Sequence, residues 1–257
     1  MLELLSRGWR VLATGLGFVV FGSAALLLRV LAFPLLRLLV RQGERRVALV
    51  RAAIRLTLRG FIALLQALGV LRYELSGLEK LERGGLLILA NHPTLLDTVF
   101  LMAFVKRADC IAKAALWHNP FTAGPVRAAG YINNAGGPEL IADCIASLRR
   151  GNNLIVFPEG TRTPAGGLVR FKRGAANIAV RGGRDVTPVL ISCQPSMLGK
   201  GEAWWRVPLR RARFTIEVRE DLAVGGFAPD GVSEALAARR LNDFLQQYFT
   251  GKQEHHA

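Results

Sequence analysis

The stretch ILANHPTLLDTVF, residues 88–100, joins an apolar run to a helical pattern through a short polar turn. The run GLLILA, residues 85–90, is typical of a buried strand, because it is short, apolar and bounded by glycine and asparagine. Pro93 suits the first turn of the helix that we expect over residues 94–106. Because α/β sheets place their sites at the carboxyl ends of strands, we expect His92 to lie at such a site.

His92 and Asp97 lie five residues apart in this stretch. Residues five apart in a regular helix differ by about 140° in direction, so a hydrogen bond between them requires His92 to fold back from the loop. The carboxylate would then accept the proton of one imidazole nitrogen and leave the other free to take a proton from a substrate hydroxyl. The alternative is a helix cap, in which Asn91 or Thr94 caps the helix and His92 merely lies nearby.

A second motif, FPEGTRT at residues 157–163, also follows an apolar strand-like run. Gly160 allows the backbone to approach a ligand, while Glu159, Thr161 and Arg162 supply an acceptor, a hydroxyl and a fork for phosphate or carboxylate. The alternative for this motif is a turn with a surface ion pair.

The rest of the sequence alternates between strand and helix patterns. VTPVLIS is another buried run, and RYELSGLE and ARFTIEVRE alternate as more exposed strands would. Helical patterns cover residues 138–150, 174–180 and about 232–249. This order predicts an α/β fold in which helices flank a central mixed sheet.

Residues 1–72 are both hydrophobic and basic. They hold eleven arginines, no lysine and two acids, which gives +9 of the net +15 charge of the 257-residue chain. Residues 11–28 carry no charge and reach the lower length of a membrane-spanning helix. In a following helix, residues 44–70, Arg51, Arg55 and Arg59 recur every four residues and form one stripe.

These features predict a two-helix membrane-binding segment over residues 1–72 and a catalytic domain over residues 73–257. An anionic membrane surface fits such a segment better, as a binding partner, than nucleic acid does. Segments that bind nucleic acid typically have aromatic residues interleaved with basic ones. We expect the arginine stripe to face lipid phosphates. The alternative is a helix that packs on the catalytic domain and keeps a solvated basic face.

The sequence offers no other catalytic constellation. Cys110, Cys144 and Cys193 are an odd number without short spacing, as expected of reduced thiols in a cytosol-facing protein. The sequence contains no G-x-S-x-G nucleophile elbow and no metal-ligand cluster. We therefore expect neither a metal nor a bound cofactor.

Together, NHPTLLD with His92 and Asp97, FPEGTRT downstream and the VTPVLIS block resemble the lysophospholipid acyltransferase family, which acylates glycerolipids and related lipid hydroxyls. The resemblance covers roughly residues 73–249 and implies the glycerolipid acyltransferase fold. KAALWHNP and AAGYINN, with the N-terminal segment, are also similar to the acyltransferases of bacterial gene clusters for aryl-polyene lipids.

The resemblance implies roles for individual residues. His92 is the general base that deprotonates an acceptor hydroxyl, and Asp97 orients it. The hydroxyl attacks the thioester of an acyl-acyl-carrier protein or acyl-CoA, which is a co-substrate, without an acyl-enzyme intermediate. Glu159, Gly160 and Arg162, with Thr161 between them, match the block that binds the polar part of the acceptor.

Two further positions concern substrate recognition. Lys113 occupies the usual lysine position of the family, which faces the thioester or the headgroup. Asn133 and Asn134 stand where the family commonly has an arginine that holds the acceptor phosphate. A charged hydrogen bond is worth about 1.5–3 kcal/mol, enough to change acceptor preference about tenfold or more.

The predicted function is a membrane-bound O-acyltransferase at the inner face of the cytoplasmic membrane. It would transfer a fatty or aryl-polyenyl acyl group to a lysophospholipid or a related lipid acceptor. One alternative is a lipid or thioester hydrolase, in which the same base activates water. Another is a non-enzymatic membrane lipid-binding module, which would not need His92 beside Asp97.

Overall fold

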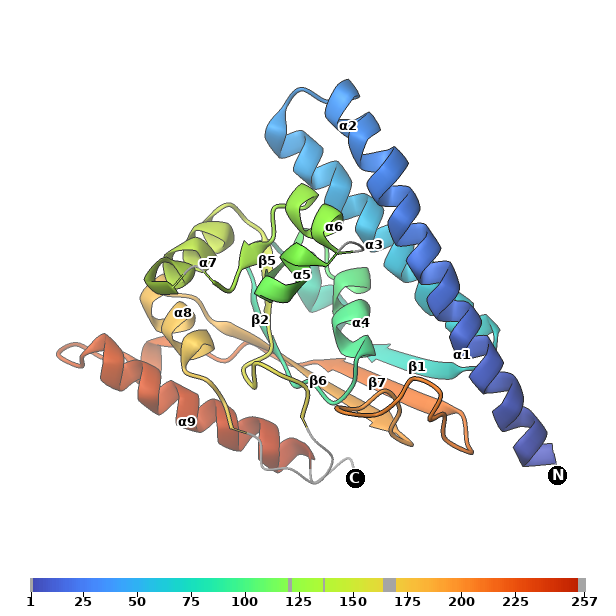
Figure 1. Cartoon of the computed structure of the whole chain (residues 1–257). Helices are drawn as coiled ribbons and strands as arrows, with labels where there is room; N and C mark the ends of the chain where they lie inside the picture. Colours follow the sequence, from blue (N-terminus) through green and yellow to red (C-terminus); the bar gives the residue numbers. More distant parts are fainter. Residues whose placement is uncertain (1, 120–121, 136, 164–169, 254–257) are drawn as a thin grey trace.

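The computed structural model describes residues 2–119, 122–135, 137–163 and 170–253. Within these ranges, seven strands form one sheet in the order β1-β7-β6-β2-β5-β3-β4 (Figure 1). The strands from β6 to β4 are mutually parallel, whereas β7 is antiparallel to β6 and β1 is parallel to β7. The sheet is therefore mixed, as the sequence predicts. The strand bounds are β1 Leu71–Ser76, β2 Leu87–Ala90, β3 Ala108–Ala112, β4 Ile132–Asn133, β5 Asn153–Val156, β6 Val186–Gln194 and β7 Ala212–Val218.

Helices cover both faces of the sheet (Figure 1). The helix α4 (Leu96–Phe104) lies on one face with the N-terminal helices, and α7 (Leu140–Arg149), α8 (Gly174–Gly182) and α9 (Glu234–Gln253) lie on the other. Two short helices, α5 (Ala114–His118) and α6 (Ala123–Ala128), follow β3. Four 3₁₀ or π turns complete the described elements: η1 Leu28–Ala32, η2 Leu78–Glu82, η3 Gly137–Glu139 and η4 Gly225–Phe227.

The strand β2 shows why its sequence is apolar throughout. Ile88 and Ala90 belong to the hydrophobic cluster on the α4 face, and Leu87 and Leu89 belong to the cluster on the α7–α9 face. All four residues have no solvent exposure. Since successive side chains point to opposite faces, a strand covered on both sides needs apolar residues at every position.

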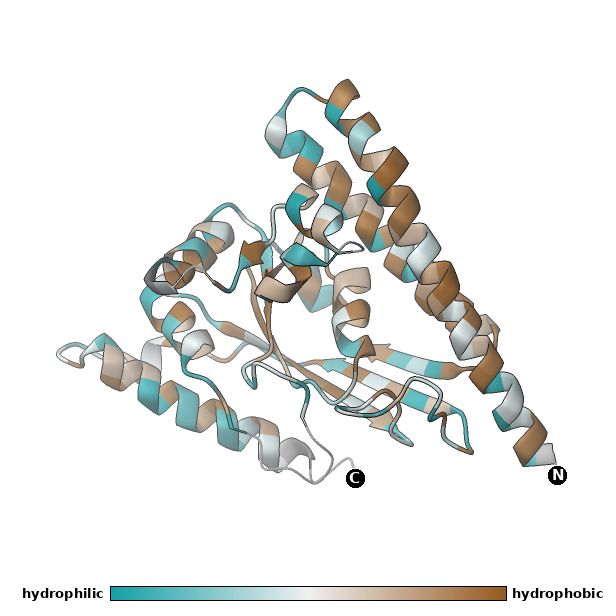
Figure 2. Ribbon diagram, in the orientation of Figure 1, coloured by the Kyte–Doolittle hydropathy of each residue, from teal (hydrophilic) through white to brown (hydrophobic). Residues whose placement is uncertain are grey.

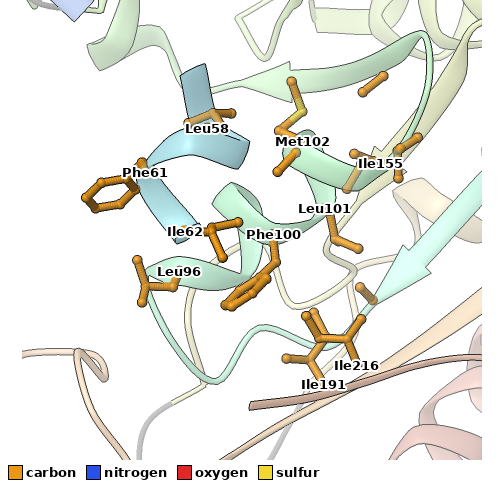
Figure 3. Close-up of a cluster of buried hydrophobic side chains, with 14 of the residues drawn as sticks. Leu58, Phe61, Ile62, Leu96, Phe100, Leu101, Met102, Ile155, Ile191 and Ile216 are labelled. Carbon is orange, nitrogen blue, oxygen red and sulfur yellow. The ribbon is translucent and has the colours of Figure 1, made fainter. Parts of the chain in front are cut away.

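The larger core lies between the sheet and two helices, α4 and α3 (Gly43–Ala67). Figure 3 shows Phe61 and Ile62 of α3, Phe100 of α4, and Ile191 and Ile216 of the sheet gathered in this core. The helix α3 therefore contributes to the same hydrophobic core as the strands that follow residue 72, and its outer side is covered by the N-terminal helix.

The N-terminal helix runs from α1 (Leu2–Leu27) through the π-helical η1 into α2 (Phe33–Leu39). One segment of it, Glu3–Leu39, is long and apolar enough to cross a membrane. One side packs on α3, where the Phe21 ring lies 4.9 Å from the Phe61 ring. Figure 2 shows hydrophobic residues along most of this helix, including its outward side.

The first arginine of the α3 stripe differs from the expectation drawn from the sequence. Arg51 forms an ion pair with Asp109 of β3 at 3.0 Å and is only 10% exposed. The Arg59 guanidinium lies 5.5 Å from the ring centre of Phe104 in α4. Arg51 thus packs against the domain that follows residue 72, because Asp109 is a buried carboxylate that needs a counter-charge, whereas Arg59 keeps an exposed position on the same helix.

Candidate active site

The carboxyl ends of the parallel strands bring the predicted residues to one edge of the sheet. The strand β2 leads into His92, β3 into Lys113 and β5 into the FPEGTRT motif. Asn133 lies in β4 at the same edge. This edge is where open α/β sheets hold their ligands.

Asp97 lies in the first turn of α4 and is fully buried. Its Oδ2 lies 2.9 Å from Nδ1 of His92 and accepts the backbone N–H of Thr94 at 2.7 Å. Its Oδ1 accepts the Thr94 hydroxyl at 2.6 Å. The hydrogen bond expected from the five-residue spacing is present, and the same carboxylate also satisfies the start of the helix.

Asn91 does not cap α4. Its side-chain nitrogen donates to the carbonyl of Ile191 at 2.7 Å, and its oxygen accepts the Ile191 N–H at 2.7 Å. The residue therefore extends the pairing of β2 with β6 beyond the end of β2, which fixes the backbone immediately before His92.

The electrostatics of the pair favour one orientation of the imidazole. Burial raises the pKa of the Asp97 carboxyl, while the hydrogen bonds from His92 and Thr94 act in the opposite direction. A carboxylate at Nδ1 requires the proton on that nitrogen, so Nε2 of the neutral ring is the basic atom. The ring stacks on Phe157, with centroids 4.2 Å apart and planes at 22°. Asp97 and Phe157 thus hold the ring from its edge and from one face.

Glu159 joins the two motif loops. Its Oε1 accepts the backbone N–H of His92 at 3.2 Å, and its Oε2 accepts the Thr163 hydroxyl. The Thr163 N–H donates in turn to the His92 carbonyl at 2.9 Å. Burial raises the pKa of the Glu159 carboxyl, and the two donated hydrogen bonds partly offset this effect. The predicted acceptor-binding residue therefore also positions His92.

Gly160 allows a lysine to lie against the FPEGTRT loop. Its φ is +68°, and a Cβ at this position would come within 2.8 Å of Nζ and Cε of Lys172. Lys172 also donates its backbone N–H to Pro158 at 2.7 Å. Its ammonium group is thus close to the loop, a contact that the sequence reasoning missed because FKRG resembles only the start of the next helix.

Arg162 is held by backbone carbonyls. Its Nη1 donates to Leu198 at 3.1 Å and to Gly199 at 2.8 Å. These carbonyls come from the segment between β6 and β7, so Arg162 joins that segment to the FPEGTRT loop. Thr161, the remaining residue of the predicted block, is half-buried between Gly160 and Arg162.

Lys113 and the two asparagines lie around the start of α5. Lys113 is exposed and immediately precedes the helix. Asn134 accepts the N–H of Ala114 at 2.8 Å, and Asn133 accepts the N–H of Ala135 at 3.0 Å. At the position of the arginine expected from the family, Asn134 therefore ties the loop to the start of α5, and Asn133 stabilises the loop itself.

A groove of about 850 Å³ lies away from this edge, between α3 and the amino ends of β3 and β4. Its lining includes Arg55, Met102, Lys106 and Tyr131, and it does not include His92. Across the described ranges, His, Cys, Asp and Glu do not gather in a group that could hold a metal ion.

The middle of the chain is similar to a known family and to enzymes of known name. Residues 72–192 match the family model described as Acyltransferase, so the resemblance drawn from the motifs is confirmed. The 1-acyl-sn-glycerol-3-phosphate acyltransferase of Pseudomonas aeruginosa is 31% identical over 125 residues, which are 46% of this chain and 49% of the relative. The enzyme of the same name from Helicobacter pylori is 33% identical over 131 residues, 46% of this chain and 55% of the relative. The matches span about half the length of these relatives.

The fold extends the likeness to nearly the whole chain. The crystal structure of the 1-acyl-sn-glycerophosphate (LPA) acyltransferase, PlsC, from Thermotoga maritima superposes with a TM-score of 0.68 at 23% identity. The superposition covers 95% of this chain and 98% of that one. The predicted fold class, a mixed sheet flanked by helices with a long apolar N-terminal helix, is confirmed.

Proposed function

We propose that this protein is a lipid O-acyltransferase in which His92 is the general base. The observation that carries the proposal is the buried Asp97 carboxylate at Nδ1 of His92, in a domain of the acyltransferase family. The acyl donor is an acyl-carrier-protein or CoA thioester, and the acceptor is the hydroxyl of a lysophospholipid or a related lipid.

In this mechanism, Nε2 of His92 takes the proton of the acceptor hydroxyl as its oxygen attacks the thioester carbonyl carbon. Asp97 stabilises the imidazolium that forms, because its carboxylate lies 2.9 Å from Nδ1. The carbon–sulfur bond then breaks, and the departing thiolate receives the proton from His92. An ester and a free thiol leave, and no covalent enzyme intermediate is required.

Three cations are candidates for binding the polar part of the acceptor or the donor. Arg162 belongs to the FPEGTRT loop, Lys172 lies against it, and Lys113 follows the neighbouring strand β3. Since Asn133 and Asn134 replace one expected cation, we propose an acceptor preference that differs from that of relatives with the arginine. We propose an aryl-polyenyl thioester as one candidate acyl donor.

The outward apolar side of α1 and α2 supports a membrane location. Large side chains such as Leu12, Val19 and Leu38 are exposed by 70%, 65% and 78%. A helix of this kind lies in or across a bilayer rather than in water. We propose the inner face of the cytoplasmic membrane, with the catalytic edge facing the cytoplasm, where acyl thioesters are made.

The test is to incubate purified protein with an isotopically labelled acyl thioester and a panel of lysolipids in mixed micelles. Mass spectrometry should detect labelled diacyl product and an equal amount of free thiol. Thiol release that is equally fast without an acceptor would indicate a hydrolase and contradict the proposal. No turnover with any donor, together with retained lipid binding, would instead indicate a lipid-binding module.

A further inference from the structure

The segment between β6 and β7, residues 195–211, exposes large apolar side chains. Trp204, Trp205 and Leu209 are exposed by 43%, 57% and 51%. Figure 1 draws this segment, in orange, close to the N-terminal half of α1. Neighbouring exposed aromatic and aliphatic side chains on one segment mark an interaction surface.

Hydrogen bonds fix the segment to α1. Arg7 donates through Nε to the carbonyl of Val207 at 3.0 Å. Arg10, which is 6% exposed, donates through Nη2 to the carbonyls of Pro208, at 3.2 Å, and Leu209. Because the buried Arg10 guanidinium donates to backbone carbonyls, it fixes the β6–β7 segment relative to α1.

Aromatic packing continues this attachment. A Cβ on Gly15 of α1 would lie 3.2 Å from the Trp204 ring, so the glycine lets the indole pack closely on the helix. Trp204 meets Phe18 edge-on, with centroids 6.4 Å apart, and Trp205 at 5.5 Å. Trp205 is therefore the outermost of three rings in edge-to-face contact, and the innermost ring is Phe18 of α1.

The part of α1 to which the segment is attached also exposes large apolar side chains. Leu5, Trp9 and Leu12, on the part of α1 to which the segment is attached, are exposed by 66%, 53% and 70%. Tryptophan prefers the interface between the headgroups and the hydrocarbon, because its ring is apolar and its N–H is polar. Two attached elements therefore both expose large apolar and aromatic side chains, and the indole N–H of Trp9 donates to the Leu68 carbonyl at 2.9 Å.

Exposed basic residues on the segment accompany this face. Lys200, Arg206 and Arg210 are exposed. The acid of the segment, Glu202, is half-buried and accepts the Gly199 N–H at 2.7 Å. This charge pattern complements anionic lipid headgroups.

The same segment contacts both catalytic motifs. The carbonyl of Leu198 accepts the N–H of Leu95 at 3.0 Å and Nη1 of Arg162 at 3.1 Å. Leu198 has φ +56°, which is uncommon for a leucine. Such a strained backbone conformation is kept only where the surrounding contacts hold it in place. The segment is thus joined to the His92 turn and to the FPEGTRT loop.

We infer that the β6–β7 segment is a second membrane-contacting element. Trp205 and Leu209 insert into the interfacial layer of an anionic bilayer beside α1, and Leu198 and Gly199 hold the catalytic edge at headgroup height. This inference rests on the membrane location of α1 proposed above, so its test reports on α1 and on the segment separately.

The chain has four tryptophans, so the fluorescence of one residue is measured alone by replacing the other three. Two such single-tryptophan proteins are compared. One keeps Trp205, with phenylalanine at residues 9, 117 and 204. The other keeps Trp9, with phenylalanine at residues 117, 204 and 205. Each is mixed with vesicles of phosphatidylglycerol and phosphatidylethanolamine in which the lipid is brominated near the headgroup, and the tryptophan fluorescence is measured.

Bromine should quench Trp205 to at least half the extent of Trp9. Quenching of Trp9 without quenching of Trp205 would overturn the inference while leaving the location of α1 intact. If neither residue is quenched, both the location of α1 and the inference fail, whatever the enzymatic activity. Acrylamide quenching of Trp205 is also measured without lipid at increasing protein concentration. If the quenching decreases, a second copy of the chain covers Trp205, and the inference is overturned.

A double variant provides a test in the protein with its other tryptophans in place. Trp205→Ser with Leu209→Ser should weaken the binding to anionic vesicles by about tenfold or more, because two interfacial apolar side chains are lost. The matched control is Leu236→Ser with Phe244→Ser on α9, exposed by 41% and 37% and across the sheet from α1 (Figure 1). Equal binding by the two double variants would contradict the inference.

Discussion

Asp97 combines two roles that the sequence presents as alternatives. Its oxygens accept the N–H and the hydroxyl of Thr94 at the start of α4, and Oδ2 also contacts Nδ1 of His92. One buried carboxylate therefore caps the start of the helix and orients His92, the proposed base. Replacement of Asp97 will consequently affect stability and turnover together, whereas replacement of His92 should separate them.

His92→Ala should lower turnover by at least about 10²-fold, the low end for general base catalysis, with little change in the melting temperature. Asp97→Asn should cause a similar loss of turnover and also lower the melting temperature, because an amide presents its own N–H groups to the donors of Thr94. Turnover with the labelled thioester and thermal unfolding in detergent measure both effects. His118→Ala, at an exposed histidine of α5, is the control; near-normal turnover of purified His92→Ala would show that the base is wrongly assigned.

Lys172 should contribute to acceptor binding, since its ammonium group lies against Gly160 in the FPEGTRT loop. Lys172→Ala should raise the KM for an anionic acceptor about tenfold, the value of one charged hydrogen bond, with a smaller change in kcat. Arg149→Ala removes an exposed cation at the end of α7 and should leave the KM unchanged. Equal KM values for the two variants would exclude Lys172 from the site.

The cysteines should be chemically silent at neutral pH. Burial raises the pKa of Cys110, Cys144 and Cys193 to about 12 in each case. Below that pH the thiols stay protonated, and the thiolate is the reactive form. Iodoacetamide at pH 7.5 should therefore leave acyl transfer intact over a time that alkylates all three thiols of the unfolded protein. Rapid inactivation, accompanied by modification of one cysteine, would contradict this expectation.

At the scale of elements, the docking of α3 depends on a buried ion pair. Arg51 contacts Asp109, donates to the carbonyl of Ala129 at 2.8 Å, and lies 5.5 Å from the Tyr131 ring centre. Asp109 also accepts the Ser147 hydroxyl at 2.5 Å. One arginine thus joins α3 to β3 and to the turn before β4.

Arg51→Ala should lower the free energy of unfolding by about 3 kcal/mol, because it leaves the buried Asp109 without its counter-charge. Arg55→Ala, one turn further along the same helix, should change it by less than about 0.5 kcal/mol, as is usual at a partly exposed site. Thermal unfolding in detergent measures the difference. Equal melting temperatures for the two variants would mean that the pair does not stabilise the docking of α3.

Local sequence signals predicted the elements that carry the candidate site residues. The strands β2, β5 and β6 are short apolar runs between glycine, asparagine and proline, and the polar turn after β2 identified His92 and Asp97. A single sequence shows these signals because each is a pattern among residues that are close together in the chain.

The strand β3 was not predicted, and neither was the buried contact of Arg51 with it, for one physical reason. Asp109 is compatible with a buried strand because Arg51, from α3, neutralises it and Ser147, from α7, donates a hydrogen bond to it. Likewise, the carbonyl partners of Arg162 come from a segment beyond β6. Contacts between distant segments leave no periodic pattern in a single sequence, so the structure was needed to find them.

At the scale of the whole molecule, the N-terminal helix has two different sides. Phe18 and Phe21 pack on Phe61 of α3, while Leu12 and Val19 are exposed. Removal of α1 and α2 would uncover Phe61 and the neighbouring core, so a truncated protein would aggregate for reasons unrelated to lipid. Substitutions on the outward side alone provide the cleaner test of membrane binding.

Leu12→Gln, Val19→Gln and Leu31→Gln change three side chains that are exposed by 70%, 65% and 61%. Since burial of one such side chain is worth about 1.5–3 kcal/mol, losing three should weaken membrane binding by about 10³-fold or more. The unmodified protein should stay with vesicles at high salt, because hydrocarbon burial is not screened by ions, whereas the triple variant should bind only at low salt through its basic residues. Flotation of both forms at low and high salt measures this. A wild-type protein that salt releases would mean that charge, rather than the apolar side of α1, provides the attachment.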